Sequence, residues 1–152
     1  TLKPMAEAIT EGFDQILWLD GQTHQYAEEA GQMNVFFRIG DEVITPELSG
    51  TILPGVTRDS VIQLLSDWGY TVSTRQMSIQ ELKSASDAGI LNEMFGAGTA
   101  AVIAPIQSIT LHDEELSVNA PNGPELSKRL LDTILGIQHG TIADTHGWTV
   151  KI

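Results

Sequence analysis

Apolar residues recur along the chain at two spacings, which together predict a mixture of helices and strands. Helical spacing places apolar residues on one face in three segments, namely residues 2–9, 58–68 and 124–139. Ser78 and Glu81 form the capping box of a fourth, shorter helix, which should end near Gly89. We therefore expect four helices, separated by segments with the pattern of strands or turns.

Short apolar or alternating runs predict the strands, at residues 13–19, 33–39, 42–45, 70–77 and 92–111, the last with a glycine turn inside it. Gly40 and Asp41 are typical of a two-residue hairpin, so the strands on either side should pair antiparallel. The polar residues 20–31 should form turns, and residues 113–118 a short edge segment. Hairpins outnumber strand–helix–strand units in this pattern, which favours the α+β class.

Domain organisation follows from length and from the first residues. No linker, repeat or low-complexity tract divides residues 1–152, so we expect a single domain. The chain begins with Thr1 rather than an initiator Met, and helical spacing starts at once. We therefore expect this domain to be a piece of a longer protein.

Charge and composition narrow the classes of partner. The chain has 8 Lys and Arg against 20 Asp and Glu, a formal net charge of −12. Such an acidic chain repels nucleic-acid phosphates and anionic lipids, so we expect neither nucleic acid nor a membrane as a partner. Without cysteine, and with four histidines that lack metal-ligand spacing, it is expected to bind no metal. Long apolar runs and a signal peptide are also missing from the sequence, which indicates a cytoplasmic protein.

A proline–glycine pair precedes the helix predicted at 58–68. After Pro54 and Gly55, the backbone N–H groups of Val56 and Thr57 should be unpaired at the positive end of the helix dipole, which suits a phosphate. The alternative is an ordinary loop–helix junction with Thr57 as N-cap, and this stretch alone favours that alternative. A nucleotide-binding P-loop is excluded, because no Gly-Lys-Ser/Thr follows.

A glycine-rich stretch, FGAGTAA at residues 95–101, matches the dinucleotide fingerprint G-x-G-x-x-A. That fingerprint needs a helix after it, whereas VIAPI here has the pattern of a strand. We interpret the stretch as a tight turn where backbone N–H groups and the Thr99 hydroxyl can approach a ligand closely. A glycine turn without a ligand stays an equal alternative.

Two adjacent carboxylates, Glu28 and Glu29, precede the strand at 33–39. Neighbouring residues of an extended chain point to opposite sides, so at most one of them should face a given site. The alternative is two solvated charges, and the acidic run at residues 112–115 is interpreted as a solvated turn.

Three stretches in fixed order resemble the large-domain signature of branched-chain amino acid aminotransferases, which are pyridoxal-phosphate enzymes of fold type IV. They are EEAGQMNVFF (28–37), ITPELSGTILPGVTRDS (44–60) and MFGAGTAAVIAP (94–105). Further stretches are most similar to bacterial members, namely QILWLDG (15–21), NGPELSKRLLDTILGIQHG (122–140) and DTHGW (144–148). The resemblance implies barrel-like mixed strands with flanking helices, and it implies that this chain is the C-terminal portion of the large domain with its N-terminal part missing.

The resemblance also implies roles for individual residues. Glu29 would pair with the pyridine nitrogen, and Leu53 would pack on the ring face. Gly55, Val56 and Thr57 would hold the cofactor phosphate at the helix N-terminus.

At the substrate side, the resemblance assigns Thr99 to both the phosphate and the substrate, and the Ala100 N–H to the substrate carboxylate. Gln32 stands where several relatives have threonine, in the loop near that carboxylate.

The resemblance implies that the full-length parent is a homodimer that exchanges the amino group of leucine, isoleucine or valine with 2-oxoglutarate. Its substrates would be amino acids and 2-oxo acids. The Schiff-base lysine would lie upstream of the segment that matches Thr1 to Ala8. None of the chain's four lysines aligns with it, so we expect no catalytic residue here and no activity of the chain alone. The alternatives are a non-catalytic cofactor-binding domain and another fold type IV enzyme, a D-amino acid aminotransferase or aminodeoxychorismate lyase.

Overall fold

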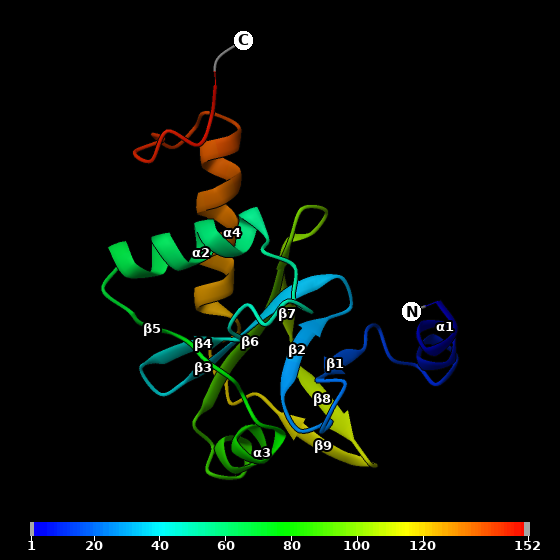
Figure 1. Cartoon of the computed structure of the whole chain (residues 1–152). Coiled ribbons are helices and arrows are strands. Elements are labelled where there is room, and N and C mark those ends of the chain that lie inside the picture. The colour runs from blue at the N-terminus through cyan, green and yellow to red at the C-terminus, as the bar shows by residue number, and fades with distance from the viewer. Residues whose placement is uncertain (1, 151–152) are drawn as a thin grey trace.

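One mixed sheet of seven strands organises the computed structural model, which describes residues 2–150 (Figure 1). Its strands are β1 (Leu17–Leu19), β2 (Ala27–Ala30), β3 (Met33–Ile39), β4 (Glu42–Thr45), β5 (Thr71–Thr74), β6 (Leu91–Gly98) and β7 (Val102–Ile106). A separate hairpin consists of β8 (Ser108–Leu111) and β9 (Glu114–Ser117). The helices are α1 (Leu2–Thr10), α2 (Val56–Asp67), α3 (Ile79–Asp87) and α4 (Glu125–Gln138). This mixture confirms the α+β expectation.

Strand β3 is the centre of the sheet. One of its edges pairs with β6 along the whole strand, from Asn34 opposite Ala97 to Ile39 opposite Leu91. Its other edge pairs with β2 at the start of the strand and with β4 at the end. The sheet is therefore split along this second edge, between β2 and β4, and the chain that leaves β4 for α2 starts from this split.

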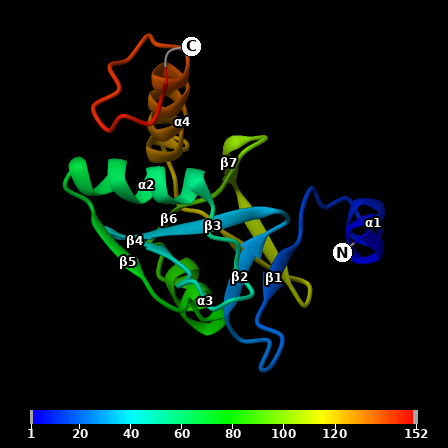
Figure 2. The same cartoon turned by 45° about the horizontal axis from the view of Figure 1, so that its top comes forward.

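Helices cover both faces of the sheet, which divides the apolar core in two. Figure 2 shows α2 and α4 on one side of the strands and α3 on the other. Phe36 and Phe95 form one cluster with Val61, Leu64 and Leu65 of α2 and with Leu126, Leu130 and Ile134 of α4. Val35, Phe37 and the buried residues of α3 form the other, together with Leu116 of β9. Successive residues of β3 thus alternate between the two clusters, as strand geometry requires.

Several element boundaries differ from the sequence-based expectations. The strand expected at residues 13–19 is formed only by Leu17–Leu19, and the expected turn region contains strand β2. The second part of the 92–111 segment is broken at Gln107 into β7 and β8. The hairpin with Gly40 and Asp41 at its turn is confirmed, and Gly40 has a positive φ of +55°.

Strands β4 and β5 pair in parallel, with Val43 opposite Val72 and Thr45 opposite Thr74. Helix α2 makes the connection between them, so β4, α2 and β5 form one βαβ unit inside a sheet that is otherwise antiparallel. Parallel strands require such a crossover, and no local pattern in the sequence indicated this pairing. Along the chain, the N-terminus of α2 thus follows the end of β4 at Thr45.

The C-terminal residues dock against α2 and α4 without regular structure. His146 Nε2 lies 2.7 Å from Asp67 Oδ2 at the end of α2, and its ring stacks on Trp148 at 4.5 Å between centroids. Backbone and hydroxyl donors reach the Asp144 carboxylate, and these hydrogen bonds, led by the Thr149 N–H, lower the pKa of Asp144 to about 2. None of the helices within residues 2–150 has both the length and the apolar composition of a membrane-spanning segment.

Replacing Ser78 by alanine should lower the free energy of unfolding by about 1 kcal/mol, because an N-cap hydroxyl is lost. Ser78 Oγ accepts a hydrogen bond from the Glu81 N–H at 3.0 Å. Ser84 is the matched control, since its exposed hydroxyl donates to the Gln80 carbonyl and accepts from Gln80 Nε2, both within the same helix. Urea denaturation should give Ser84→Ala a stability equal to wild type or slightly above, and equal losses for both variants would contradict the cap.

Candidate functional site

Helix α2 begins without a side-chain cap. Its N-cap is Gly55, in an extended conformation with φ −71° and ψ 135°, and its first helical residue is Val56 rather than Arg58. Thr57 lies inside the first turn, so the alternative in which Thr57 is the N-cap is wrong. Among residues 2–150, none accepts a hydrogen bond from the N–H groups of Val56, Thr57 or Arg58. Three adjacent amide donors are therefore open at the positive end of the helix.

The segment before α2 is seated on the start of β3 through Asn34. This side chain is only 5% exposed, and its Nδ2 donates to the Leu53 carbonyl at 2.8 Å. A Cβ at Gly55 would overlap Asn34 Oδ1, which leaves room for glycine alone unless Asn34 moves. Gly55 thus allows a close backbone approach that fixes where the helix starts.

The Glu29 carboxylate reaches the same segment from β2. Its Oε1 accepts from the Leu53 N–H at 3.1 Å and from Asn34 Nδ2 at 3.4 Å. No lysine, arginine or histidine among the described residues lies within ion-pair distance of Glu29. The carboxylate is half-buried and keeps Oε2 without a hydrogen-bond partner within residues 2–150.

A β-bulge in β2 lets the carboxylates of Glu28 and Glu29 contact the same loop, which precedes α2. Trp18 pairs with Glu29 and Leu19 with Ala27, so Glu28 is the extra residue. Ala27 and Ala30 consequently face the same apolar cluster, although they lie an odd number of positions apart. Glu28 Oε1 accepts from Thr51 Oγ1 at 2.7 Å, in the loop that Glu29 also contacts. The expectation that adjacent carboxylates face opposite sides is wrong here, because the bulge interrupts the alternation.

The glycine-rich stretch forms the end of β6 and the turn into β7. Residues 99–101 make the turn, and a strand follows, which confirms that the stretch is no dinucleotide fingerprint. Gly96 and Gly98 lie in the strand, where a Cβ on either would come within 3.1 Å of the Met33 side chain. These glycines therefore make room for Met33, while Thr99 and Ala100 are exposed at the turn.

The substrate-side candidates meet at neighbouring turns. Gln32 occupies the exposed turn between β2 and β3, and its carbonyl oxygen lies 3.7 Å from the position of a Cβ on Gly98. Because Gly98 directly precedes Thr99, the two turns are adjacent. Asn34 in turn stands opposite Glu29 on β2 and opposite Ala97 on β6.

Asn34 is thus the common neighbour of all three parts of the site, namely β2, the segment 53–55 and the end of β6. Asn34 was not among the site residues predicted from the sequence. A polar residue at the second position of the apolar run MNVFFRI was the available signal, since a buried amide must find partners.

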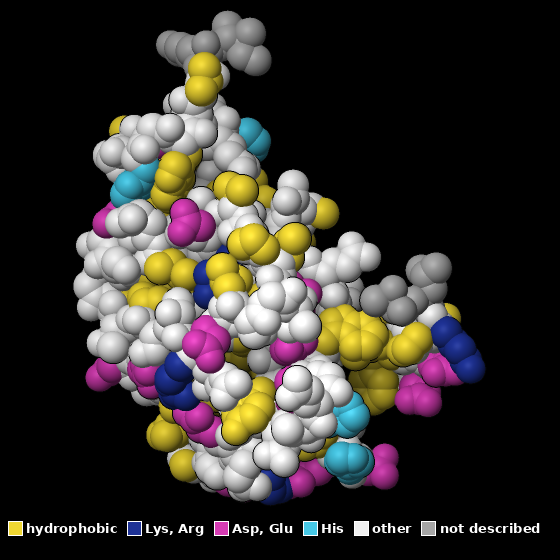
Figure 3. Space-filling view, in the orientation of Figure 1, with side chains coloured by type: hydrophobic (Ala, Val, Ile, Leu, Met, Phe, Trp, Pro, Cys, Tyr) yellow, Lys and Arg dark blue, Asp and Glu magenta, His cyan; other side chains and the backbone are white. Residues whose placement is uncertain are grey.

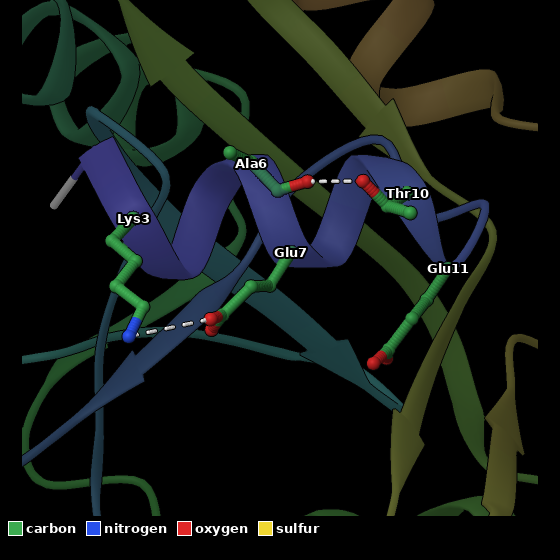
Figure 4. Close-up of a pocket in the computed structure, with 5 residues that line it drawn as sticks. All are labelled: Lys3, Ala6, Glu7, Thr10 and Glu11. Atoms are coloured by element: carbon green, nitrogen blue, oxygen red, sulfur yellow. Dashed lines mark hydrogen bonds and ion pairs between the residues drawn. The ribbon is translucent and has the colours of Figure 1, made fainter.

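The remaining surface features lie away from this arrangement. The hollow drawn in Figure 4 runs along α1 and is lined by Lys3, Ala6, Glu7, Thr10 and Glu11, with Lys3 paired to Glu7. Acidic side chains are scattered over the face in Figure 3. Residues 2–150 contain no group of three or more His, Asp or Glu that could hold a metal ion.

Comparisons with known proteins identify what the chain resembles. The model of the amino-transferase class IV family matches residues 2–109. Branched-chain-amino-acid aminotransferase 2 of Bacillus subtilis is 50% identical over 152 residues, which are 100% of this chain and 42% of the relative. A probable branched-chain-amino-acid aminotransferase of Staphylococcus epidermidis is 48% identical over 93% of this chain and 39% of its own length. The chain thus spans about two-fifths of the length of these relatives.

Solved structures have the same fold. The branched-chain amino acid aminotransferase of Escherichia coli superposes with a TM-score of 0.76 at 29% identity, over 94% of this chain and 43% of that one. Another solved branched-chain amino acid aminotransferase, complexed with N-(5'-phosphopyridoxyl)-L-glutamate, gives a TM-score of 0.77 at 30% identity, over 94% and 44%. A fold IV transaminase of Curtobacterium pusillum gives 0.68 at 25% identity, over 86% and 40%.

Proposed function

This chain belongs to the amino-transferase class IV family, and from that premise we propose that it carries the pyridoxal-phosphate-binding part of a branched-chain aminotransferase. The parent would transfer the amino group of leucine, isoleucine or valine to 2-oxoglutarate. We further propose that residues 1–152 are one domain, the C-terminal portion of the large domain, and that the parent is a homodimer.

The start of α2 is suited to the cofactor phosphate. Three open N–H groups and the helix dipole meet there, and this combination binds phosphate in many proteins. In our proposal the N–H groups of Val56 and Thr57 donate to phosphate oxygens, while Gly55 lets the backbone turn into the helix. The Thr99 hydroxyl adds a donor from the neighbouring strand end.

Glu29 is suited to the ring nitrogen. Leu53 links Glu29 to the start of α2. Its N–H donates to the Glu29 carboxylate, and the chain then runs three residues to Val56. Three residues span at most about 11 Å, a distance that a pyridine ring and its phosphomethyl arm can bridge. The carboxylate would keep a proton on the ring nitrogen, while the Leu53 side chain, 68% exposed, packs on the ring face. Bound pyridoxal phosphate supplies the electron sink for amino transfer.

The exposed turns of Gln32 and Ala100 would complete the substrate side, where the Ala100 N–H binds the substrate carboxylate. Amino transfer also needs a base that moves the proton of the amino acid. Lys83 pairs with Glu114, Lys128 with Asp132 and Lys3 with Glu7, so the three described lysines are engaged elsewhere. We therefore expect this chain to bind cofactor but to transaminate only with a lysine supplied by further protein.

The observation that carries the proposal is the link from Glu29 through Leu53 to the open end of α2. Equilibrium binding of pyridoxal phosphate, followed by quenching of Trp fluorescence, tests it. Trp18 pairs with Glu29 across β1 and β2, so its emission reports on this site.

Glu29→Gln should weaken binding of pyridoxal phosphate by about tenfold or more, because a charge-assisted hydrogen bond to the ring nitrogen is lost. Glutamine keeps an acceptor for the Leu53 N–H, so the fold is preserved. Glu28→Gln is the matched control and should stay within about twofold of wild type, since its contact is to the Thr51 hydroxyl. Equal effects of the two substitutions, or no binding by the wild-type chain, would contradict the proposal.

A further inference from the structure

Arg58 is a buried cation without a negatively charged partner. The residue is 7% exposed, and its Nη2 donates to the Pro46 carbonyl at 2.9 Å. Its Nε is buried with no hydrogen-bond partner, and no carboxylate within residues 2–150 lies at ion-pair distance. Desolvation lowers the pKa of Arg58, and only the charge of the adjacent, exposed Asp59 opposes this effect.

Each of the other arginines has a carboxylate or an aromatic ring as partner, although the Nε of Arg38 is also buried without a hydrogen-bond partner. Arg38 pairs with Glu93 and lies over the Tyr70 ring, and Arg75 pairs with both Glu42 and Glu81. Arg129 stacks on an aromatic ring, that of Trp68, at 3.7 Å from its centroid. Burial of a guanidinium without a carboxylate or an aromatic ring as partner costs free energy. The missing counter-charge of Arg58 therefore calls for an explanation.

The position of Arg58 suggests what that counter-charge is. Arg58 is the third residue of α2, in the same turn as the open N–H groups, and helical side chains lean toward the N-terminus of their helix. Its bond to Pro46 also ties the first turn of α2 to the end of β4. A dianion at the open N–H groups, one of which belongs to Arg58 itself, would therefore lie at the same helical turn as this buried positive charge.

Building on the proposed function, we propose that Arg58 is a positioning residue for the cofactor phosphate, whose dianion supplies the counter-charge that the guanidinium lacks. Arg58 acts through the first turn of α2, by its charge and by its hold on Pro46. The ligand class is a phosphate monoester or inorganic phosphate. Ligands without phosphate should gain nothing from Arg58.

The test compares ligands with and without the phosphate on the same protein. Dissociation constants of pyridoxal phosphate, pyridoxal and inorganic phosphate are measured for the chain, Arg58→Met, Arg58→Lys and Arg129→Met. The decisive quantity is the pyridoxal constant divided by the pyridoxal phosphate constant. A change in the folded fraction affects both constants equally, so a loss of global stability leaves this ratio unchanged.

Arg58→Met should lower the ratio by about tenfold and weaken inorganic phosphate similarly, as expected for one charge near a dianion. Arg58→Lys should recover most of the ratio, and Arg129→Met, which removes a cation from α4, should leave it unchanged. A ratio for Arg58→Met within twofold of wild type would overturn this inference alone. A wild-type ratio near one would instead overturn the phosphate site of the proposed function.

Discussion

Val56→Pro should weaken binding of pyridoxal phosphate by about 10- to 100-fold without unfolding the protein, because it deletes one open N–H donor to a charged ligand. Position 56 is the first residue of α2, where proline is favoured, and the Val56 side chain is 83% exposed. Gly55 already has the extended conformation that a residue before proline requires. The substitution therefore removes the donor and changes little else.

The matched control for this substitution is Val56→Ala, which shortens the same side chain and keeps the N–H. Its affinity should stay within about twofold of wild type, and both variants should unfold at the wild-type temperature. Isothermal titration with pyridoxal phosphate and with pyridoxal separates the effects, since only the phosphate-bearing ligand should lose affinity. If the proline variant binds pyridoxal phosphate as tightly as the alanine variant, the phosphate does not bind at this helix end.

Removal of the Phe36 ring should have the largest effect on stability, a loss of about 3–5 kcal/mol in the free energy of unfolding. Phe36 is fully buried on β3 and stands directly opposite Phe95 on β6, with ring centroids 5.0 Å apart. Phe36→Ala leaves a cavity between the sheet and the helices α2 and α4, which cover this face of the sheet. Since small domains are stable by about 5–15 kcal/mol, this loss is a large share of the total.

Two control variants are compared with Phe36→Ala by their free energy of unfolding. Phe36→Leu keeps most of the volume and should cost about 1.5 kcal/mol or less. Phe13→Ala removes a ring that is 41% exposed and should change stability by about 0.5 kcal/mol at most. Denaturant unfolding followed by circular dichroism gives all three values. A loss below about 1 kcal/mol for Phe36→Ala would mean that this cluster does not hold the layers together.

Local patterns predicted most of the elements. The hairpin at Gly40, the cap at Ser78 and the stripe of α4 depend on neighbouring residues, and each appears in the structure as expected. Strand β2 was missed because two central glutamates lower strand propensity and hide a bulge. Bulges arise from pairing with another strand, which local spacing does not encode.

The candidate site could be predicted only as separate stretches. Their order and spacing predicted the branched-chain aminotransferase resemblance, which the family match and the relatives confirm. The relatives named above also favour the branched-chain group over the other fold type IV enzymes. Asn34 and Arg58 were missed, because their importance comes from burial and from contacts to distant loops. The individual roles of Glu29, Val56, Thr57 and Thr99 stay predictions.

The central claim is that the end of α2, the turn after β6 and Glu29 bind one pyridoxal phosphate molecule. Titration of the isotope-labelled chain with pyridoxal phosphate, followed by two-dimensional amide NMR, tests it most directly. We predict saturable shifts that are largest for the N–H groups of Val56, Thr57 and Thr99, with Leu82 of α3 unaffected. Shifts confined to the hollow along α1, or spread evenly over the chain, would contradict the account.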